Sequence, residues 1–168
     1  PWGGDKALFG TDPIAFACPR DGNPPMVFDY ATSASARGEI QVAARDGHSI
    51  PEGWALDKDG NSTTDPAAAL EGVQLPFGGH KGNAIMIMVE LLSAGLTGGN
   101  FCFEAQEQVD AFGGHDAGPS NAGQIFILIE PKGFHKTFLQ RVESLFERIL
   151  EQDGTRLPGD RRYANRAR

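Results

Sequence analysis

The sequence predicts an α/β protein, and three observations lead to this fold class. Short apolar runs have the length of strands, other segments repeat apolar residues at helical spacing, and glycine or proline separates the two kinds of segment. The 168 residues are 40% hydrophobic and 22% charged, which suits one compact core of ordinary size. Strands and helices alternate too irregularly to predict a doubly wound parallel sheet.

Three segments are predicted to be strands. The sequence DPIAFA at 12–17 alternates apolar side chains behind a proline, and MVFDY at 26–30 is a short apolar run after the turn signal DGNPP. The run QIFILIE at 124–130 is the clearest of the three. Its nearly unbroken apolar character predicts a buried strand.

Two helices are predicted in the first half of the chain. Residues 34–46 carry apolar positions at helical spacing, with Gly47 as the stop and one of three polar residues as N-cap: Thr32, Ser33 or Ser35. Asp65 followed by Pro66 predicts the start of a short helix. The rest of 48–72 is rich in turn signals and is predicted to be a surface excursion.

Two further helices are predicted in the second half. Residues 83–96 are apolar on nearly all sides, so this helix should be covered all round, either within the chain or by a second copy in a homodimer. A single apolar stripe runs from Phe134 to Leu150, and Asp153–Gly154 ends that helix. Residues 104–123 are predicted to form a loop.

Charge and cysteine content exclude several classes of protein. A net charge of -7 disfavours nucleic-acid binding, and the arginines near the C-terminus are interpreted as a solvated end of the chain. The apolar run at 84–96 is too short to span a membrane and contains Glu90, and no secretory signal opens the sequence. Two cysteines give no disulfide framework. A soluble cytoplasmic protein is therefore expected.

The stretch GGHKG at 78–82 is the first candidate binding site. Glycines before a helix allow close approach of a ligand, and the helix N-terminus favours an anion such as a phosphate. Lys81 adds a cation, and His80 adds a donor that titrates near neutral pH. The stretch matches neither GxxxxGK[ST] nor GxGxxG. A tight connection whose polar residues face water remains the alternative.

The second candidate is FDYATSASARGE at 28–39, where a strand passes into small residues at a helix start. Arg37 could hold a carboxylate through two hydrogen bonds, or lie on a solvated helix face. Arg37 and Glu39 are two residues apart, so they share a cleft only if the helix begins after them or bends there.

The remaining reactive side chains suggest no further site. His48, His115 and His135 are interpreted as surface residues, and no pair of them is spaced for a metal ion. Cys18 and Cys102 are interpreted as small buried hydrophobic residues. The sequence offers no Ser-His-Asp order, which argues against a hydrolase.

Seven motifs, in order, carry a family resemblance: LFGTDPIAF, MVFDYATS, ARGE, IPEGWALDKDG, TTDP, LPFGGHKGNAIMIMVELLSAGLTGG and LPGDRR. The set resembles the malate/L-lactate dehydrogenase family of NAD(P)-dependent oxidoreductases, which lacks a conventional Rossmann fold. The resemblance covers Ala7 to Arg162. It implies a mixed, largely antiparallel sheet with packed helices. LPFGGHKG and LPGDRR are most similar to Δ1-piperideine-2-carboxylate/Δ1-pyrroline-2-carboxylate reductases, which make L-pipecolate or L-proline with NADPH.

The resemblance also implies roles for individual residues. Thr11, Arg37 and Gly38 would bind a small carboxylate-bearing substrate, and Glu39 would orient the catalytic histidine. The residues implied to contact NADPH (or NADH) are Asp29, Tyr30, Ala31, His80, Lys81, Arg156, Leu157, Pro158, Gly159 and Asp160. Two positions depart from the common pattern: Glu39 replaces aspartate, and Asp12 stands in GTDP where GTNP is commoner.

The family's catalytic histidine precedes the region that resembles this chain. Residues 1–168 are therefore expected to be the cofactor-binding and C-terminal part of the enzyme, with the N-terminal catalytic segment lying outside them. Three functions remain open. They are an NAD(P)H-dependent reductase of a cyclic imino acid, an NAD(P)-dependent dehydrogenase of the malate or lactate type, and a non-catalytic module that binds an anion or forms a dimer.

Overall fold

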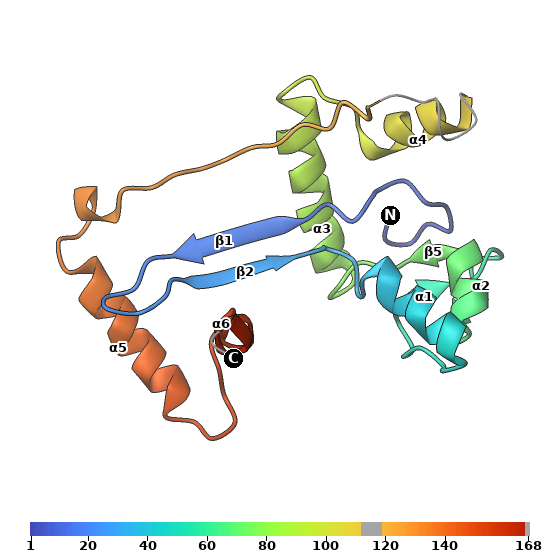
Figure 1. Cartoon of the computed structure of the whole chain (residues 1–168). Helices are drawn as coiled ribbons and strands as arrows, with labels where there is room; N and C mark the ends of the chain where they lie inside the picture. Colours follow the sequence, from blue (N-terminus) through green and yellow to red (C-terminus); the bar gives the residue numbers. More distant parts are fainter. Residues whose placement is uncertain (112–118, 167–168) are drawn as a thin grey trace. The chain divides into compact units, whose positions relative to one another are not determined.

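The computed structural model describes residues 1–111 and 119–166 (Figure 1). The chain divides into two compact units. Unit 1 comprises Pro1–Ile14 and Ala31–Ile125, and unit 2 comprises Ala15–Tyr30 and Phe126–Arg168. His115, predicted to be a surface residue, lies outside the described residues, while His48 and His135 are exposed as predicted. Within the described ranges, no helix has the length and apolar character needed to cross a membrane.

Unit 1 contains a small sheet packed on two helices. Strand β3 (Ala55–Leu56) lies between β4 (Ser62–Thr63) and β5 (Val73–Gln74), and both pairings are antiparallel. Helices α1 (Arg37–Asp46) and α2 (Pro66–Glu71) supply Ile40 and Ala69 to a core that also holds Ile50 and Ala55. The prediction of a surface excursion at 48–72 is therefore wrong, because its few apolar side chains fold back onto α1.

The predicted helix at 34–46 is confirmed as α1, although its N-cap was wrongly assigned. Gly47 ends the helix in a left-handed conformation, with φ 73°. The N-cap is Ala36, and no described side chain caps it. The hydroxyl of Thr32 instead donates to backbone carbonyls at Thr11 and Asp12. The start of α2 is confirmed, since the Asp65 side chain accepts from the backbone N–H of Ala67 at 2.9 Å.

Helix α3 (His80–Glu90) continues into a π-helical turn, η1 (Leu91–Gly95), so the predicted helix at 83–96 exists but begins three residues earlier. The earlier start is possible because Gly79, with φ 62°, turns the chain into the helix. The described part of the chain does not cover this helix all round, so its cover by a second copy stays a prediction. Four of its apolar residues are exposed: Ile87, Met88, Leu91 and Leu96.

Helix α4 (Cys102–Ala111) replaces the first part of the loop predicted at 104–123. The Glu104 carboxylate accepts from the backbone N–H of Phe101 at 2.9 Å and stabilises the start of the helix. Gln106 also donates to Asp110 one turn later. These local contacts outweigh the polar composition that suggested a loop. Residues 112–118 of the predicted loop lie outside the described ones.

In unit 2, strands β1 (Ile14–Cys18) and β2 (Met26–Tyr30) confirm the two strands predicted near the N-terminus. They run in opposite directions in Figure 1. Rings stack along the pair, with centroids 5.6 Å apart for Phe16 and Phe28 and 5.0 Å apart for Phe28 and Tyr30. The mixed fold with small antiparallel sheets agrees with the predicted class.

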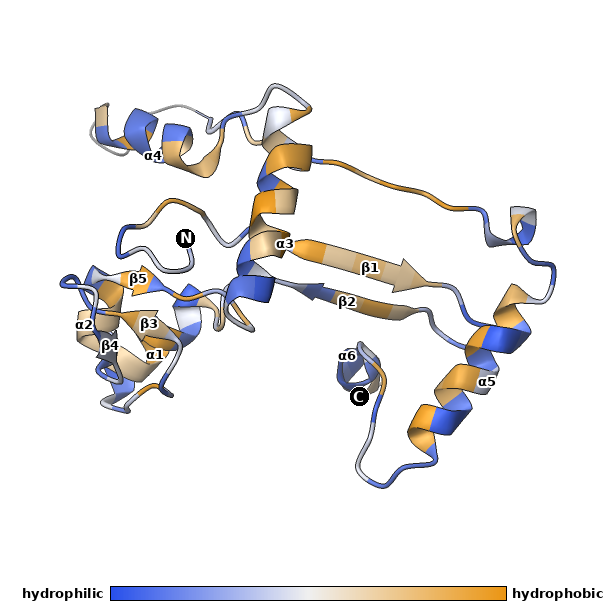
Figure 2. Ribbon diagram, turned by 180° about the vertical axis from the view of Figure 1, so that it is seen from behind, coloured by the Kyte–Doolittle hydropathy of each residue, from blue (hydrophilic) through white to orange (hydrophobic). Residues whose placement is uncertain are grey.

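Helix α5 (Phe138–Leu150) confirms the last predicted helix and shows its apolar stripe in Figure 2. It starts after a 3-10 turn, η2 (Pro131–Gly133), which leaves Phe134 outside it. Arg20 binds Glu143 of α5 through two hydrogen bonds, of 3.1 and 2.7 Å, and lies over the ring of Phe146. Of the C-terminal arginines, Arg161, Arg162 and Arg166 lie in α6 (Asp160–Arg166).

The predicted strand at 124–130 is not formed in the described structure. The segment has no strand partner there, and Phe126 and Leu128 are 78% and 90% exposed. The hydrophobic colour of this segment is visible along the ribbon in Figure 2. A strand needs a neighbour that accepts its backbone N–H groups and covers one face, and the described residues provide neither. The sequence pattern of a buried strand therefore lies on an exposed segment.

Candidate functional site

A cavity in unit 1 brings two of the predicted substrate residues together. It has a volume of about 230 Å³ and is lined by Thr11 from the N-terminal segment, Arg37 from the start of α1, and Met86 from α3. The loop and strand residues Gly72–Pro76 form another part of the wall, and Ser33 lies beside them. The cavity therefore combines a hydroxyl, a guanidinium and an apolar wall.

Backbone hydrogen bonds hold the walls of this cavity in place. Thr32 donates to the Thr11 carbonyl through both its backbone N–H, at 2.8 Å, and its hydroxyl, at 3.0 Å. On the other side, Ala34 donates to Leu75 and Phe77 donates to Thr32, at 2.7 and 3.0 Å. The segment at 32–34 thus links the N-terminal segment, which contains Thr11, with the cavity wall at 72–77.

Arg37 is an exposed cation at the edge of the cavity. Its Nη2 donates to the Leu70 carbonyl at 3.4 Å, a long hydrogen bond that uses one of its five N–H groups. The remaining donors can form the paired hydrogen bonds that a carboxylate accepts. Thr11, on the same cavity, can donate to or accept from a second polar atom of the ligand.

Glu39 and Gly38 line a different cavity, of about 420 Å³, whose wall also includes His48 and Trp54. Helix α1 starts at Arg37 and does not begin after Glu39, so the condition under which the two charges would share a cleft is not met. Glu39 is exposed. Its assignment as the group that orients a catalytic histidine remains a prediction.

The GGHKG stretch is open to solvent at the start of α3. His80 and Lys81 are its first two residues and both are exposed. Gly82 is buried, and a Cβ there would lie 1.9 Å from the Phe77 carbonyl oxygen, which only glycine permits. The Trp2 ring lies over Gly79, and the backbone N–H of Trp2 donates to Asn83 Oδ1 at 2.9 Å. His80 and the Lys81 cation are thus presented at an accessible helix N-terminus.

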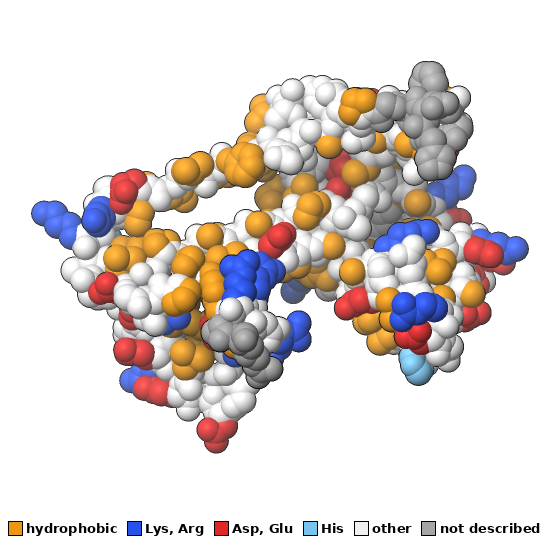
Figure 3. Space-filling model, viewed as in Figure 1, with side chains coloured by type: hydrophobic (Ala, Val, Ile, Leu, Met, Phe, Trp, Pro, Cys, Tyr) orange, Lys and Arg blue, Asp and Glu red, His pale blue; other side chains and the backbone are white. Residues whose placement is uncertain are grey.

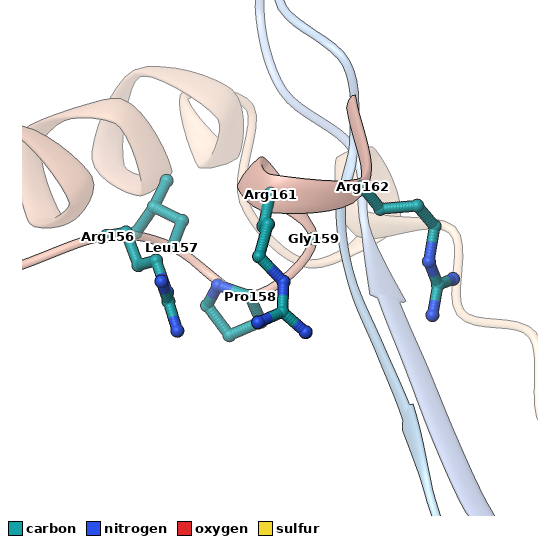
Figure 4. A pocket seen from close by; sticks show the side chains of 6 residues that line it. All are labelled: Arg156, Leu157, Pro158, Gly159, Arg161 and Arg162. Atoms are coloured by element: carbon teal, nitrogen blue, oxygen red, sulfur yellow. The ribbon is translucent and has the colours of Figure 1, made fainter. Parts of the chain in front are cut away.

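Leu157, Pro158 and Gly159 of the LPGD turn in unit 2 line a cavity of about 380 Å³ together with Arg156, Arg161 and Arg162. Figure 4 shows Arg156 and Arg161 extending toward the same side as Pro158, whereas Arg162 extends away from them. Lys and Arg side chains gather around α6 in Figure 3. The cavity is therefore cationic, which favours a phosphate-bearing ligand.

The turn itself is held by its own contacts. The Asp160 carboxylate accepts from the Leu157 N–H at 2.8 Å, and the Leu157 side chain is buried. Gly159 has φ 94°, and the carbonyl of Pro158 accepts from Val27. Some backbone groups of Leu157, Pro158 and Gly159 are therefore already used within the protein, and only the others can bind a ligand. The arginine side chains carry the positive charge of the cavity.

Asp29 and Tyr30 end β2 and are exposed, and Ala31 is half-buried. These residues belong to the predicted cofactor site, and their assignment stays a prediction. Arg161 and Arg162 are cavity residues that sequence reasoning missed, because the arginine-rich end was interpreted as solvated. The signal that could have found them is the position of both arginines directly after the LPGD turn.

Comparison with known proteins identifies the family. The family described as malate/L-lactate dehydrogenase matches residues 1–168. The chain therefore belongs to this family, as its motifs indicated. Its relatives are named as dehydrogenases and reductases, so the family is one of oxidoreductases.

Individual relatives are similar over the whole chain. A Δ1-pyrroline-2-carboxylate/Δ1-piperideine-2-carboxylate reductase of Pseudomonas syringae is 50% identical over an alignment that covers 100% of this chain and 48% of the relative. A (2R)-3-sulfolactate dehydrogenase (NADP(+)) of Chromohalobacter salexigens is 48% identical over 99% of this chain and 49% of its own length. The chain thus spans about half the length of the curated relatives it matches.

Solved structures give the same result. The crystal structure of Δ1-piperideine-2-carboxylate reductase from Pseudomonas syringae matches with a TM-score of 0.89 and 49% identity, covering 99% of this chain and 50% of that one. Sulfolactate dehydrogenase from Methanocaldococcus jannaschii matches with a TM-score of 0.81 and 37% identity, over 95% of this chain and 46% of that one. The fold is that of the malate/L-lactate dehydrogenase family.

Proposed function

We propose that the full-length protein is an NADPH-dependent reductase that converts Δ1-pyrroline-2-carboxylate or Δ1-piperideine-2-carboxylate to L-proline or L-pipecolate. The observation that carries this proposal is the 50% identity, over the whole chain, to a reductase named for these two substrates. The cavity that joins Thr11 and Arg37 supports it, because a small cyclic imino acid presents one carboxylate and one polar nitrogen.

In this proposal the chain positions the substrate. Arg37 pairs with its carboxylate, and Thr11 and Gly38 complete the substrate-binding set. Residues 1–168 are the cofactor-binding and C-terminal part of the enzyme, and an N-terminal part supplies the histidine that donates a proton to the imine nitrogen. Glu39 orients that histidine. The coverage of about half of each relative supports this division.

The cofactor, when bound, supplies the hydride that reduces the imine carbon. The proposed cofactor-binding residues are His80, Lys81 and Ala31 in unit 1, and Asp29, Tyr30 and the turn Arg156–Asp160 in unit 2. Their chemistry fits a dinucleotide phosphate, since Lys81 and the arginines of the LPGD cavity are exposed cations. The extra phosphate of NADPH makes it a better partner than NADH for a cavity lined by three arginines.

A second candidate is a 2-hydroxyacid dehydrogenase, favoured by the 48% identity to a sulfolactate dehydrogenase. Assays of the full-length protein separate the two candidates. We expect NADPH oxidation with Δ1-pyrroline-2-carboxylate or Δ1-piperideine-2-carboxylate to exceed that with pyruvate, oxaloacetate or 3-sulfopyruvate by at least tenfold in kcat/KM. The reverse order would establish the dehydrogenase, and failure to bind either NADPH or NADH would favour a non-catalytic module.

The proposed role of the α3 entrance gives a direct prediction. Replacing Lys81 by alanine should weaken NADPH binding to the full-length protein by about tenfold, because one phosphate loses a charge-assisted hydrogen bond. Fluorescence titration measures the change. Lys58→Ala is the matched control, since Lys58 is an exposed lysine of unit 1 that lines none of the described candidate sites. Equal Kd values for Lys81→Ala and the parent protein would contradict the assignment.

The proposal includes a homodimer in the cytoplasm. The exposed apolar residues of α3 and η1 support a second copy as the cover for that helix, and the two described cysteines are free thiols, as suits a reducing compartment. Light scattering on the full-length protein tests the dimer. A monomer at micromolar concentration would contradict it.

A further inference from the structure

A buried polar cluster in unit 1 has no role in the site described so far. It contains Asp12 from the N-terminal segment, Glu90 from the end of α3, and Cys102 from the start of α4. One side-chain oxygen of each acid and the Cys102 sulfur all lie within 4.8 Å of one another. Asp12 and Glu90 are only 5% and 7% exposed. Two acidic side chains are thus buried side by side.

Cys102 acts as a donor to both acids. Its backbone N–H donates to Glu90 Oε2 at 3.2 Å, and its thiol donates to Asp12 Oδ1 at 3.4 Å. Burial and then the neighbouring Glu90 raise the pKa of the Cys102 thiol to about 12, so the thiol keeps its proton at neutral pH. Gly10 leaves room for the sulfur, because a Cβ there would lie 2.9 Å from it.

The second oxygen of Asp12 has nothing to bind. Asp12 Oδ2 is buried without a hydrogen-bond partner among the described residues, and neither acid forms an ion pair with a described cation. A buried carboxylate in that state is costly, and two adjacent carboxylates repel each other. A proton on Oδ2 removes both costs, because the acid can then donate to Glu90.

Electrostatics agree with a proton held between the acids. Burial is the largest cause that raises the pKa of Asp12 to about 6, and the charge and hydrogen bond of Glu90 add to it, whereas the Cys102 thiol opposes the shift. The titratable groups that face Asp12 are Glu90 from α3 and Cys102 from α4, while the segment at 31–33 presents the uncharged Thr32. Asp12 therefore changes its charge near pH 6.

The cluster is linked to the proposed substrate cavity through one residue. Asp12 follows Thr11 and has φ 35°. Residues other than glycine rarely adopt this backbone conformation unless their surroundings hold them in it. Thr32 holds the carbonyls of Thr11 and Asp12 from one side. The Cys102 thiol holds the side chain of Asp12 and so fixes the same N-terminal segment from the other side.

We propose that Asp12 and Glu90 share one proton, and that this hydrogen-bonded acid pair is a positioning device that holds Thr11 at the substrate cavity and loosens when the proton is lost. The proposal rests on the proposed function for the role of Thr11, but the existence of the pair does not. Asp12 and Glu90 are positioning residues, and they do not contact the substrate.

Thermal unfolding of the full-length protein tests the pair without any activity. The pKa of Asp12 is higher in the folded protein than its ordinary value of 3.8, so the folded state binds more protons between these two values. The contribution of the pair to stability is complete below about pH 4 and is lost as the pH rises through about 6. The Tm of the parent, relative to that of Asp12→Asn, should therefore fall over this range.

The variants distinguish loss of the shared proton from loss of the folded structure. In Asp12→Asn the amide donates to Glu90 at every pH, so the pH dependence should disappear while the fold is kept. Glu90→Gln should remove it as well, because only one acid remains. Asp12→Ala should lower the Tm at all pH values. Cys102→Ser keeps a donor to Asp12 and should retain the parent's pH dependence.

Kinetics test the link to the cavity. Between pH 5.5 and 8 the substrate KM of the parent should rise by about threefold to tenfold more than the KM of Asp12→Asn. The kcat values of the two proteins should depend on pH in the same way. Identical Tm and KM profiles for the parent and Asp12→Asn would overturn the proposal. So would one equivalent of a divalent cation found in the purified protein by elemental analysis and lost in Asp12→Asn. If the Tm profiles differ but no imino acid is reduced, the pair stands and the proposed function fails.

Discussion

Replacing Arg37 by alanine is expected to lower kcat/KM of the full-length enzyme for its carboxylate substrate by about 10²-fold to 10³-fold. Arg37 lines the cavity that also holds Thr11, and its only described hydrogen bond is a long one to the Leu70 carbonyl. Removing the guanidinium leaves the substrate carboxylate in the cavity without its partner. The loss should be largely in KM, because the ground state uses the same ion pair.

Arg45→Ala is the matched control for this prediction. Arg45 lies in the last turn of the same helix, its side chain is 72% exposed, and it pairs with the adjacent Asp46. Its removal should change kcat/KM by less than twofold, since exposed ion pairs contribute little. Arg37→Lys should recover part of the loss, because an ammonium keeps the charge without the paired geometry. Equal kinetic constants for Arg37→Ala and Arg45→Ala would remove Arg37 from the site.

The elements that were predicted correctly are those whose signals are local. The strand at 26–30 and the helices α1, α2 and α5 each have a repeating apolar pattern and a stop or cap within their own sequence. The segment at 124–130 has the strongest strand pattern, yet a strand also needs a neighbour, and the pattern does not say where that neighbour lies. Helix α4 was missed because a side-chain cap at Glu104 decides it.

In the candidate site, too, local motifs were predicted correctly and contacts between distant residues were not. Thr11 and Arg37 were named from motifs, and the structure places both on one cavity. Glu39 received its role from the family resemblance. Residues two positions apart on a helix point in different directions, and Glu39 lines another cavity than Arg37. The cluster of Asp12, Glu90 and Cys102 could not be predicted, because Asp12 and Cys102 are 90 residues apart and nothing in either local sequence indicates that they meet.

Replacing Gly82 by alanine is the prediction with the largest expected effect on stability. A Cβ at this position would lie 1.9 Å from the Phe77 carbonyl oxygen, and a backbone atom cannot move aside as a flexible side chain can. The turn that leads into α3 must therefore shift, at a cost of about 3 kcal/mol in the free energy of unfolding. Because the shift displaces His80 and Lys81, NADPH binding should also weaken.

Gly38→Ala provides the comparison for unfolding. Gly38 lies in the first turn of α1, and a Cβ there meets nothing within 4 Å, so this variant should gain about 0.5 to 1 kcal/mol from the reduced freedom of the unfolded chain. Denaturant unfolding of both variants measures the difference. A Gly82→Ala protein as stable as Gly38→Ala would mean that the chain does not pass so close to Phe77. The entrance of α3 would then present His80 and Lys81 in some other arrangement.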